Sequence, residues 1–379
     1  MFQEPLPEKY LGMSEAEALE LIGSCKRAVS GRTVILGHHY QRDSIIQFAD
    51  FAGDSLKLSQ LAAEQKDTEF IVFCGVHFMA ESADILADDH QKVLLPQMDA
   101  GCSMADMADI GQVERCWDYL AGHVGAGKKL VPVTYVNSTA AIKAFCGDHG
   151  GMCCTSSNCR AVFSDIWERD ADAAILFLPD QHLGRNTAYG MGKKLEQMAL
   201  WDPTKPEGGL TSEQAKNAEL FLWNGFCCVH QEFSVAQIEA ARRQDPGVKV
   251  IVHPECAFDV AQAADFLGST QQIIQAVSSS EAGSRWLVGT ERNLVERLTR
   301  QMAAKGIEVR LLTTSRCICR TMNMIDPAHL AWLMDNLRRH CENPGQTPLV
   351  NQVKVDEATK RYARLALDRM LAVTAARTD

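Results

Sequence analysis

The sequence predicts an α/β protein built from three similar αβα domains with short parallel sheets, arranged with pseudo-threefold symmetry around a central active site. Two observations predict this fold. Short strands rich in Val, Ile and Leu alternate with helical stretches, which is typical of parallel sheets that are covered on both faces. One pattern of segments also occurs three times, with a period of about 100 residues, so each copy is a small domain.

The first and third copies each contain three apolar strands separated by helical stretches, and all three copies end at a cysteine. The first copy has strands at 33–36, 70–73 and 93–95 and ends at Cys102. The third copy has strands at 248–252, 286–288 and 309–312 and ends at Cys319. The spacing from His38 to Gly53 equals that from His253 to Gly268, at 15 residues. The distance to the terminal cysteine is also similar, 64 residues from His38 to Cys102 and 66 from His253 to Cys319. In the first copy we expect a helical stretch through Phe48 and Phe51.

The second copy is longer, with strands at 130–134 and 174–178 and its end at Cys227. From Tyr135 to Cys227 there are 92 residues, about 27 more than in the other copies. The additional length lies in 146–154 and 185–219, which we interpret as surface insertions.

These features divide the chain into five predicted parts. They are an N-terminal helical lead-in at 1–28, domains at 29–115, 116–235 (with the insertions) and 236–345, and a C-terminal helical tail at 346–379. Ser14, with Glu17 three residues later, predicts the start of a helix in the lead-in. The tail predicts an amphipathic helix over about 356–373, with Tyr362, Leu365, Leu367, Met370 and Leu371 as its apolar residues.

The composition is that of an ordinary globular enzyme, with 46% hydrophobic and 23% charged residues in 379. A net charge of −10 argues against nucleic acid as the main partner, since phosphate backbones require clustered Lys and Arg. No apolar run is long enough for a membrane span. The N-terminal residues 1–5 lack the basic and apolar regions of a signal peptide, so we expect a cytoplasmic protein.

Fourteen cysteines in a cytoplasmic chain favour metal ligation, catalysis or burial over structural disulfides. We expect four of them to be plain buried thiols: Cys25, Cys74, Cys116 and Cys341. A second group, Cys153, Cys154 and Cys159, is either a second metal or redox site or a set of chance thiols in an insertion loop. We favour the second interpretation.

Cys102, Cys227 and Cys319 occupy equivalent positions at the ends of the three copies. This equivalence predicts one metal site with three thiolate ligands and one open position, where a substrate can bind. Soft thiolates select Fe–S clusters, zinc or copper(I). Two ambiguities remain in the assignment, because Cys228 adjoins Cys227 and Cys317 lies two residues before Cys319; the repeat register favours Cys319.

Polar residues follow the strands directly, where ligands bind in parallel sheets. They are His38, Tyr40, Tyr135, Asn137, His253 and Glu255. The sequence His253-Pro254-Glu255 combines an acid–base pair with a rigid turn. Ser55, Ser156 and Ser269-Thr270 are expected at helix N-termini, where hydroxyls and backbone N–H groups bind anions.

At these residues the chain resembles the quinolinate synthase family, the A protein of bacterial NAD biosynthesis. The resemblance covers nearly the whole length. The motifs that carry it are Gly-His-His-Tyr at 37–40, Gly-Asp-Ser-Leu at 53–56, Tyr-Val-Asn-Ser at 135–138, Pro-Asp-Gln-His-Leu-Gly-Arg at 179–185, Trp-Asn-Gly-Phe-Cys-Cys-Val-His at 223–230, His-Pro-Glu at 253–255 and Gly-Ser-Thr at 268–270.

The resemblance implies a [4Fe–4S] cluster held by Cys102, Cys227 and Cys319, with one open iron that acts as a Lewis acid. It implies a transferase that condenses iminoaspartate with dihydroxyacetone phosphate to quinolinate, phosphate and water. Coupling to an L-aspartate oxidase or an aspartate dehydrogenase would then be expected. The implied substrate-binding residues are His38, Ser55, Tyr135, Val136, Asn137, Ser156, His253, Pro254, Glu255 and Thr270.

The same resemblance suggests roles for these residues. Glu255 is the expected general base, and His253 and Tyr40 would assist proton transfer. Ser156, Asn137 and Thr270 would hold carboxylate or phosphate oxygens. The chain departs from many members in one respect: it has only Cys317-Ile-Cys319 where they carry a Cys-x-x-Cys-x-x-Cys run.

Two other functions are compatible with parts of the sequence. An Fe–S dehydratase could use an open iron on another hydroxy acid, but the full set of motifs would then be unexplained. A non-catalytic metabolite-binding protein with a structural zinc is the other alternative, although structural zinc normally has four protein ligands.

Overall fold

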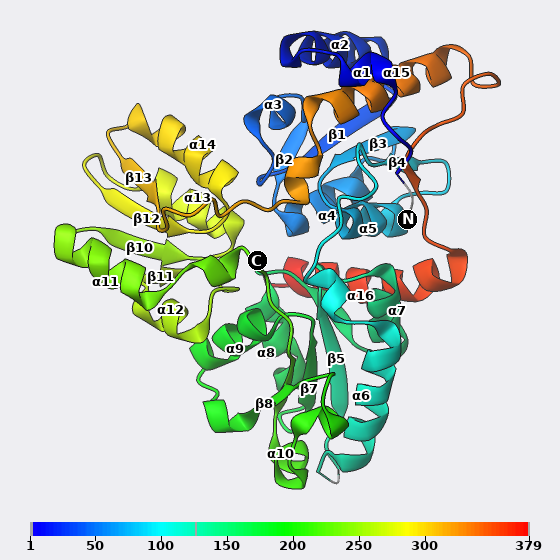
Figure 1. Cartoon of the computed structure of the whole chain (residues 1–379). Coiled ribbons are helices and arrows are strands. Elements are labelled where there is room, and N and C mark those ends of the chain that lie inside the picture. The colour runs from blue at the N-terminus through cyan, green and yellow to red at the C-terminus, as the bar shows by residue number, and fades with distance from the viewer. Residues whose placement is uncertain (1–2, 126, 378–379) are drawn as a thin grey trace. The chain divides into compact units, whose positions relative to one another are not determined.

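The computed structural model describes residues 3–125 and 127–377 and confirms the predicted α/β fold class, with short, mostly parallel sheets flanked by helices. The chain forms two compact units (Figure 1). Unit 1 comprises Met1–Cys102 and Ile318–Asp356, and unit 2 comprises Ser103–Cys317 and Glu357–Asp379. Within the described residues, no helix has the length and apolar character needed to cross a membrane.

Three sheets share one strand order, which explains the threefold repeat of the sequence. In each sheet the first strand of the repeat lies between a short parallel edge strand and the second strand, and the third strand follows the second. The first sheet has the order β14-β4-β3-β1-β2, with strands β1 Thr33–His38, β2 Phe51–Gly53, β3 Phe70–Cys74, β4 Lys92–Leu94 and the antiparallel β14 Gln352–Val353. The second has the order β6-β5-β7-β9-β8, with β5 Leu130–Tyr135, β6 Met152–Cys154, β7 Ala174–Leu178, β8 Met198–Trp201 and β9 Leu220–Trp223. The third has the order β11-β10-β12-β13, with β10 Lys249–Val252, β11 Phe266–Leu267, β12 Arg285–Gly289 and β13 Glu308–Leu311.

Apart from β14, the strands of each sheet pair in parallel, and the pairing runs without interruption along the central strands. Four residues of β10 pair with four of β12, from Lys249 with Trp286 to Val252 with Gly289. The central strands are fully buried, as the near-continuous hydrophobic runs predicted. The strands β1–β4, β5–β9 and β10–β13 each fall within one of the predicted ranges, while the domain boundaries themselves remain a proposal.

Unit 1 packs its N-terminal helices against a late helix of the chain. Its helices are α1 Glu8–Leu11, α2 Glu15–Ala28, α3 Asp43–Ile46, α4 Ser55–Glu64, α5 His77–Leu86, α15 Pro327–Glu342 and the 3-10 turn η5 Met322–Met324. The predicted start of α2 is confirmed, since Ser14 and Glu17 form a reciprocal capping box. Helix α15 contacts both α1 and α2.

Unit 2 contains the second and third sheets and the C-terminal helix. Its helices are α6 Ile110–His123, α7 Ala140–Asp148, α8 Cys159–Arg169, α9 Gln181–Gly190, α10 Ser212–Asn217, α11 Val235–Gln244, α12 Phe258–Ala263, α13 Thr270–Ser278, α14 Arg292–Ala303 and α16 Glu357–Ala375, with 3-10 turns η1 Ala105–Met107, η2 Leu195–Gln197, η3 Pro206–Gly209 and η4 His230–Glu232. The predicted tail helix is α16, which packs on α7, α8 and β6 and is drawn in red in Figure 1. A Cβ on Gly147 of α7 would lie 1.9 Å from the Tyr362 carbonyl oxygen of α16, so glycine is what allows the two backbones to approach.

The structure corrects four sequence-based expectations. Phe51 does not continue a helix, because the chain ends α3 at Ile46 and enters edge strand β2 at Phe51. The segment 146–154 is not a surface insertion: Cys146, Cys153 and Cys154 are buried, and β6 occupies the same sheet position as β2 and β11. Residues 185–219 do lengthen the second copy, but they are not only a surface insertion, because they include β8, which extends the second sheet. Leu365, expected on the apolar face of α16, is 41% exposed.

Asp335 of α15 links this helix to α1 within unit 1. Its carboxylate accepts hydrogen bonds from Tyr10 (2.7 Å), Lys9 (3.1 Å) and Arg338 (2.8 Å). Burial alone raises the pKa of Asp335, but the hydrogen bonds from Arg338, Tyr10 and Lys9 outweigh it and lower the pKa from 3.8 to about 2. A group whose pKa falls on folding stabilises the protein above its unfolded pKa, and this stabilisation is lost as pH falls through the folded pKa.

We therefore expect Asp335→Asn to lower the free energy of unfolding of unit 1 by about 1–2 kcal/mol at neutral pH. This value allows for the weakening of the Lys9–Asp335 ion pair by solvent, because the Lys9 side chain is exposed. Urea unfolding of both proteins from pH 8 downward measures this. The difference should be constant down to about pH 5 and shrink as pH falls below about 4. A difference that is already absent at pH 7, or that grows on acidification, would show that Asp335 contributes no net stabilisation as a carboxylate.

Candidate functional site

The candidate site of unit 2 is formed at the carboxyl ends of parallel strands. Tyr135 ends β5, Ser156 follows β6, and His253 directly follows β10. Thr290 follows β12, and Thr270 is the first residue of α13, after β11. The strand ends therefore bring together side chains that are far apart in the sequence, as expected for parallel sheets.

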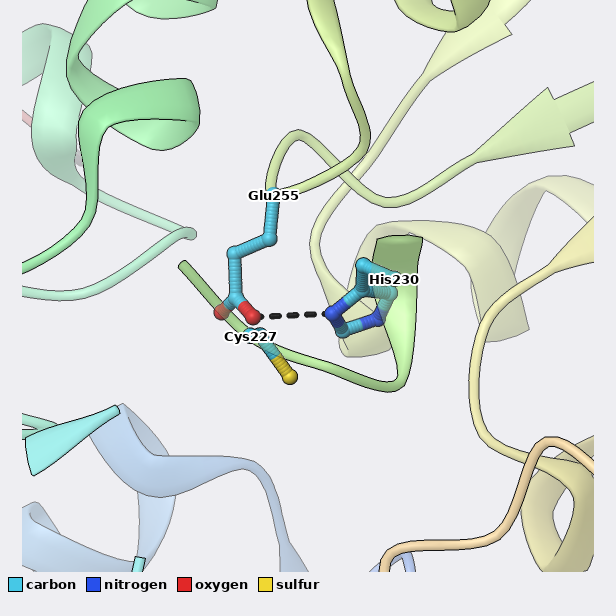
Figure 2. Close-up of side chains that lie close together, drawn as sticks. All are labelled: Cys227, His230 and Glu255. Atoms are coloured by element: carbon cyan, nitrogen blue, oxygen red, sulfur yellow. Dashed lines mark hydrogen bonds and ion pairs between the residues drawn. The ribbon is translucent and has the colours of Figure 1, made fainter. Parts of the chain in front are cut away.

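Glu255 is the centre of this group (Figure 2). Its Oε2 lies 2.8 Å from Nδ1 of His230, and its Oε1 lies 3.7 Å from Nδ1 of His253. The Tyr135 hydroxyl also hydrogen-bonds to the Glu255 carboxylate. Burial by itself raises the pKa of Glu255, but His230, His253 and the hydrogen bonds from His230 and Tyr135 outweigh it and lower the pKa to about 2. Glu255 is therefore a buried, ionised carboxylate.

His230 and His253 are stacked, with ring centroids 4.5 Å apart and planes inclined by 16°. Only 1% of the His230 side chain and 2% of the His253 side chain are exposed. Since an ionised carboxylate only accepts hydrogen bonds, Nδ1 of His230 carries the proton. In its neutral form, His230 then accepts at Nε2 from the Thr290 hydroxyl, 3.2 Å away.

His253 has the opposite tautomer. The Glu255 backbone N–H donates to its Nδ1 at 3.3 Å, so the proton is on Nε2 and is donated to the Ser156 hydroxyl at 3.2 Å. Burial lowers the pKa of His253 to about 3, and it is a neutral imidazole. The two histidines thus flank Glu255 with their proton positions fixed by different partners.

The turn that carries Glu255 is held by side-chain amides. Asn186 of α9 donates from Nδ2 to the carbonyl oxygens of Pro254 (2.8 Å) and Cys256 (2.9 Å). Gln231 donates to the Glu255 carbonyl oxygen at 3.1 Å. Three consecutive carbonyls after His253 are therefore fixed, which restricts the position of the Glu255 side chain.

Cys227 lies beside this group. Its Sγ, a ring nitrogen of His230 and a carboxylate oxygen of Glu255 all lie within 4.8 Å of one another (Figure 2). Across the described parts of the chain, this is the only group of three or more Cys, His, Asp or Glu side chains close enough to hold a metal ion. The thiols of Cys146, Cys153, Cys154 and Cys159 are all buried.

The three predicted ligands differ from most other cysteines in exposure. Cys102, Cys227 and Cys319 are half-buried, whereas nine cysteines are fully buried. Cys102 and Cys319 each follow the last residue of a third strand by eight positions, after Leu94 and Leu311. All three lie in the loop after a third strand and are thiols that a metal could reach.

Cys317 and Cys228, the two cysteines next to predicted ligands, differ in their burial. Cys317 is buried, and its Sγ lies 3.6 Å from the carbonyl oxygens of both Val229 and Thr290. Burial, followed by the nearby charge of Glu232, raises its pKa well above the usual thiol range, so it is a poor source of thiolate. Cys228 is exposed.

Five further predicted residues belong to unit 1 or to the margins of the unit 2 site. In unit 1, His38 ends β1, and the rings of His38 and Tyr40 make an edge contact at 4.7 Å. Ser55 is the first residue of α4, after the capping Asp54. In unit 2, Asn137 has a buried Oδ1 with no hydrogen-bond partner in the described structure, and the Val136 N–H donates to the Cys154 carbonyl.

His230, Thr290, Gln231 and Asn186 were not predicted as site residues. The sequence does contain a pattern that could have identified His230. This residue ends the motif at 223–230 and follows Cys227 by three positions, a spacing typical of metal sites. Asn186 had none, since a helical asparagine that binds two distant carbonyls leaves no local pattern.

Comparison with known proteins shows the family of this chain. Residues 21–372 match the family described as "Quinolinate synthetase A protein". The chain belongs to this family. The quinolinate synthase of Acidobacterium capsulatum is 48% identical over 97% of this chain and 95% of its own length. Those of Streptomyces coelicolor and Bacillus velezensis are also 48% identical, over 95% and 98% of this chain and 89% and 97% of their own lengths.

For a member of the quinolinate synthetase A family, the donor set is suited to an iron–sulfur cluster. Thiolates are the ligands that such clusters take. The half-buried position of Cys227, beside the ionised carboxylate of Glu255 and the imidazole of His230, leaves its sulfur accessible to iron and next to acid–base groups.

Proposed function

We propose that this protein is a quinolinate synthase of NAD biosynthesis, a transferase that condenses iminoaspartate with dihydroxyacetone phosphate to quinolinate, phosphate and water. Family membership over most of the chain supports the proposal. The single observation in the structure that supports it most is the group formed by Glu255, His253 and Tyr135, which are buried and lie in family motifs, with the half-buried Ser156.

The proposal assigns a [4Fe–4S] cluster to Cys102, Cys227 and Cys319. When bound, a cluster with three thiolate ligands supplies Lewis-acid chemistry through its fourth iron, which is open to substrate oxygens. The chain's own part is to supply soft, half-buried sulfur ligands and to place proton-transfer groups beside Cys227.

Glu255 is the proposed general base, with His253 and Tyr40 assisting. Its low pKa comes from the groups that hydrogen-bond to it, so the carboxylate gains basicity when a substrate displaces one of these hydrogen bonds. His253 has a proton on Nε2, directed at Ser156. That proton is available to a substrate oxygen that takes the place of the serine hydroxyl.

Substrate oxygens would be held by hydroxyls and amides near helix N-termini. Ser156 and Asn137 follow strands of the second sheet, and Thr270 is at the positive end of α13. His38, Ser55, Val136 and Pro254 complete the proposed substrate contacts. The buried, unpartnered Oδ1 of Asn137 is consistent with a donor group on a ligand. The iminoaspartate would come from an L-aspartate oxidase or an aspartate dehydrogenase.

The reaction is tested with anaerobically purified, cluster-reconstituted protein and separate candidate substrates. We expect quinolinate to form only when iminoaspartate and dihydroxyacetone phosphate are both present. Dehydration of a hydroxy acid such as malate or citrate, without quinolinate formation, would favour the Fe–S dehydratase instead. Zinc in place of iron and sulfide would favour a metal-binding protein that uses Cys227, His230 and Glu255.

A further inference from the structure

The same backbone hydrogen bond occurs just before each of the three predicted cluster ligands. In each case, the N–H of the first residue of a helix donates to the carbonyl oxygen that lies two positions before the cysteine. The bonds join His77 to Ala100 at 2.8 Å, Gln181 to Gly225 at 3.0 Å and Arg292 to Cys317 at 3.0 Å. The cysteines that follow are Cys102, Cys227 and Cys319. We call these three bonds the loop clamps; the first lies within unit 1 and the other two within unit 2.

The three donors occupy one position of the repeat. Each begins the helix that follows the second strand of its sheet, so the helices are α5, α9 and α14 after β3, β7 and β12 (Figure 1). The first N–H groups of a helix have no partner inside the helix and can therefore bind a neighbouring loop. Donors and acceptors differ in residue type from copy to copy. The bond is therefore a property of the backbone of the repeat and does not depend on one side chain.

In unit 2, a buried carboxylate fixes the donor end of each clamp. Asp180 caps α9 by accepting from the Leu183 N–H at 2.6 Å, and Glu291 caps α14 by accepting from the Asn293 N–H at 2.8 Å. Both carboxylates are fully buried. Because an N-cap of this kind fixes the first turn of its helix, the N–H of the next residue is held in the direction of the cysteine loop.

The acceptor end of the second clamp is held by further contacts. Asp180 and Gly225 form a parallel β-bridge, and Nε2 of Gln181 donates to Oδ1 of Asn224 at 2.8 Å. A Cβ on Gly225 would lie 2.3 Å from the Pro179 carbonyl oxygen, so glycine is what allows the two backbones to approach. The loop that carries Cys227 is therefore fixed against the end of β7.

The loop clamps give a ligand register that the strands alone do not give. Cys102 and Cys319 lie eight positions after their third strands, but Cys227 lies only four positions after β9. Counted from the clamped carbonyl, all three lie at two positions. This register favours Cys227 over the adjacent Cys228. It also favours Cys319 over Cys317, which is itself the clamped residue.

We propose that the backbone N–H groups of His77, Gln181 and Arg292 position the three cysteine ligands of the [4Fe–4S] cluster. The presence of the cluster rests on the proposed function. Each clamp restrains the loop two residues from the sulfur, so less conformational entropy is lost when the thiolate binds iron. Groups that orient metal ligands in this way typically change metal affinity by about 10–100-fold.

Proline at the donor position removes the clamp and retains the helix. Proline is tolerated as the first residue of a helix, and it requires an extended residue before it. Both preceding residues are extended, with ψ of 117° at Asp180 and 138° at Glu291. The test variants are therefore Gln181→Pro and Arg292→Pro. Gln181→Ala and Arg292→Ala are the matched controls, because they lose the side chain but retain the N–H. Ser212→Pro, at the exposed first residue of α10, controls for proline itself.

Iron release to a chelator is measured after anaerobic reconstitution of each full-length protein. Each proline variant should release iron about tenfold faster than its alanine counterpart. Ser212→Pro should release iron at the wild-type rate. Thermal unfolding of the same proteins without the cluster shows whether the variants are folded.

Amide hydrogen exchange of the wild-type protein supplies a measurement that requires no variant. The N–H groups of His77, Gln181 and Arg292 should exchange about tenfold more slowly than that of Ser212, because each is held in a hydrogen bond. Exchange of the three donors as fast as that of Ser212 would overturn the proposal.

The outcomes separate the loop clamps from the proposed function. Iron release from both proline variants at the rate of their alanine counterparts would overturn the proposal. Wild-type protein that takes up no iron would reject the cluster and the proposal together. Faster iron release from the proline variants of a protein that makes no quinolinate would support the loop clamps and reject the proposed function.

Discussion

Replacing Glu255 with glutamine is expected to lower kcat by about a thousandfold while the protein stays folded. The amide keeps the volume of the side chain but removes the charge to which His230 and Tyr135 are directed. It also cannot accept a proton at physiological pH. Because the carboxylate organises both histidines, the loss should exceed that of a single substrate contact.

Quinolinate formation and thermal unfolding of Glu255→Gln and wild type measure this effect. Glu239→Gln is the matched control, since Glu239 lies on the surface of α11 and pairs with Arg243. The control should retain full activity. Activity of Glu255→Gln within tenfold of wild type would reject Glu255 as the general base.

Cys319→Ala is expected to lose most of the bound iron, whereas Cys317→Ala should retain it. Cys319 is half-buried and follows the third strand of its sheet by the same eight residues as Cys102, which is consistent with a ligand. Cys317 is buried, with its thiol near two carbonyl oxygens, which is consistent with packing. Cys317→Ala should therefore lower the unfolding midpoint instead, through the loss of these contacts.

Iron and sulfide analysis and the visible absorption of both variants after identical reconstitution measure the difference. Cys116→Ala is a suitable control, because Cys116 is also fully buried and was predicted to be structural. Equal iron content in Cys319→Ala and Cys317→Ala would reject the choice of Cys319 as the ligand.

The strands of the fold could be predicted because their hydrophobic runs are long and directly bounded by polar residues. β3 and β7, for example, are five-residue runs with every residue buried. The short edge strands could not be predicted: β2 has three residues, two of them exposed, and its Phe51 fits a helical pattern equally well. β6 was interpreted as part of a surface insertion, because it has only three residues and lies in a segment rich in Gly and Cys.

The site was predictable to the extent that its residues follow strands. Tyr135, Ser156, His253 and Glu255 were found in this way, and the structure brings them together. His230 was missed because it begins the 3-10 turn η4 after a cysteine loop and does not follow a strand, although its imidazole lies 2.8 Å from the Glu255 carboxylate. Asn186 and Gln231 act through backbone carbonyls of a distant turn, and such contacts depend on tertiary packing that no local pattern encodes.

The most direct test of the central claim is quinolinate formation through one cycle of cluster removal and reconstitution. Anaerobically prepared protein is assayed with iminoaspartate and dihydroxyacetone phosphate, stripped of iron with a chelator, assayed again, and then reconstituted. We predict that quinolinate formation disappears with the cluster and returns with it. Quinolinate formation at an unchanged rate by the stripped protein, or none from protein with a full cluster, would contradict the proposed function.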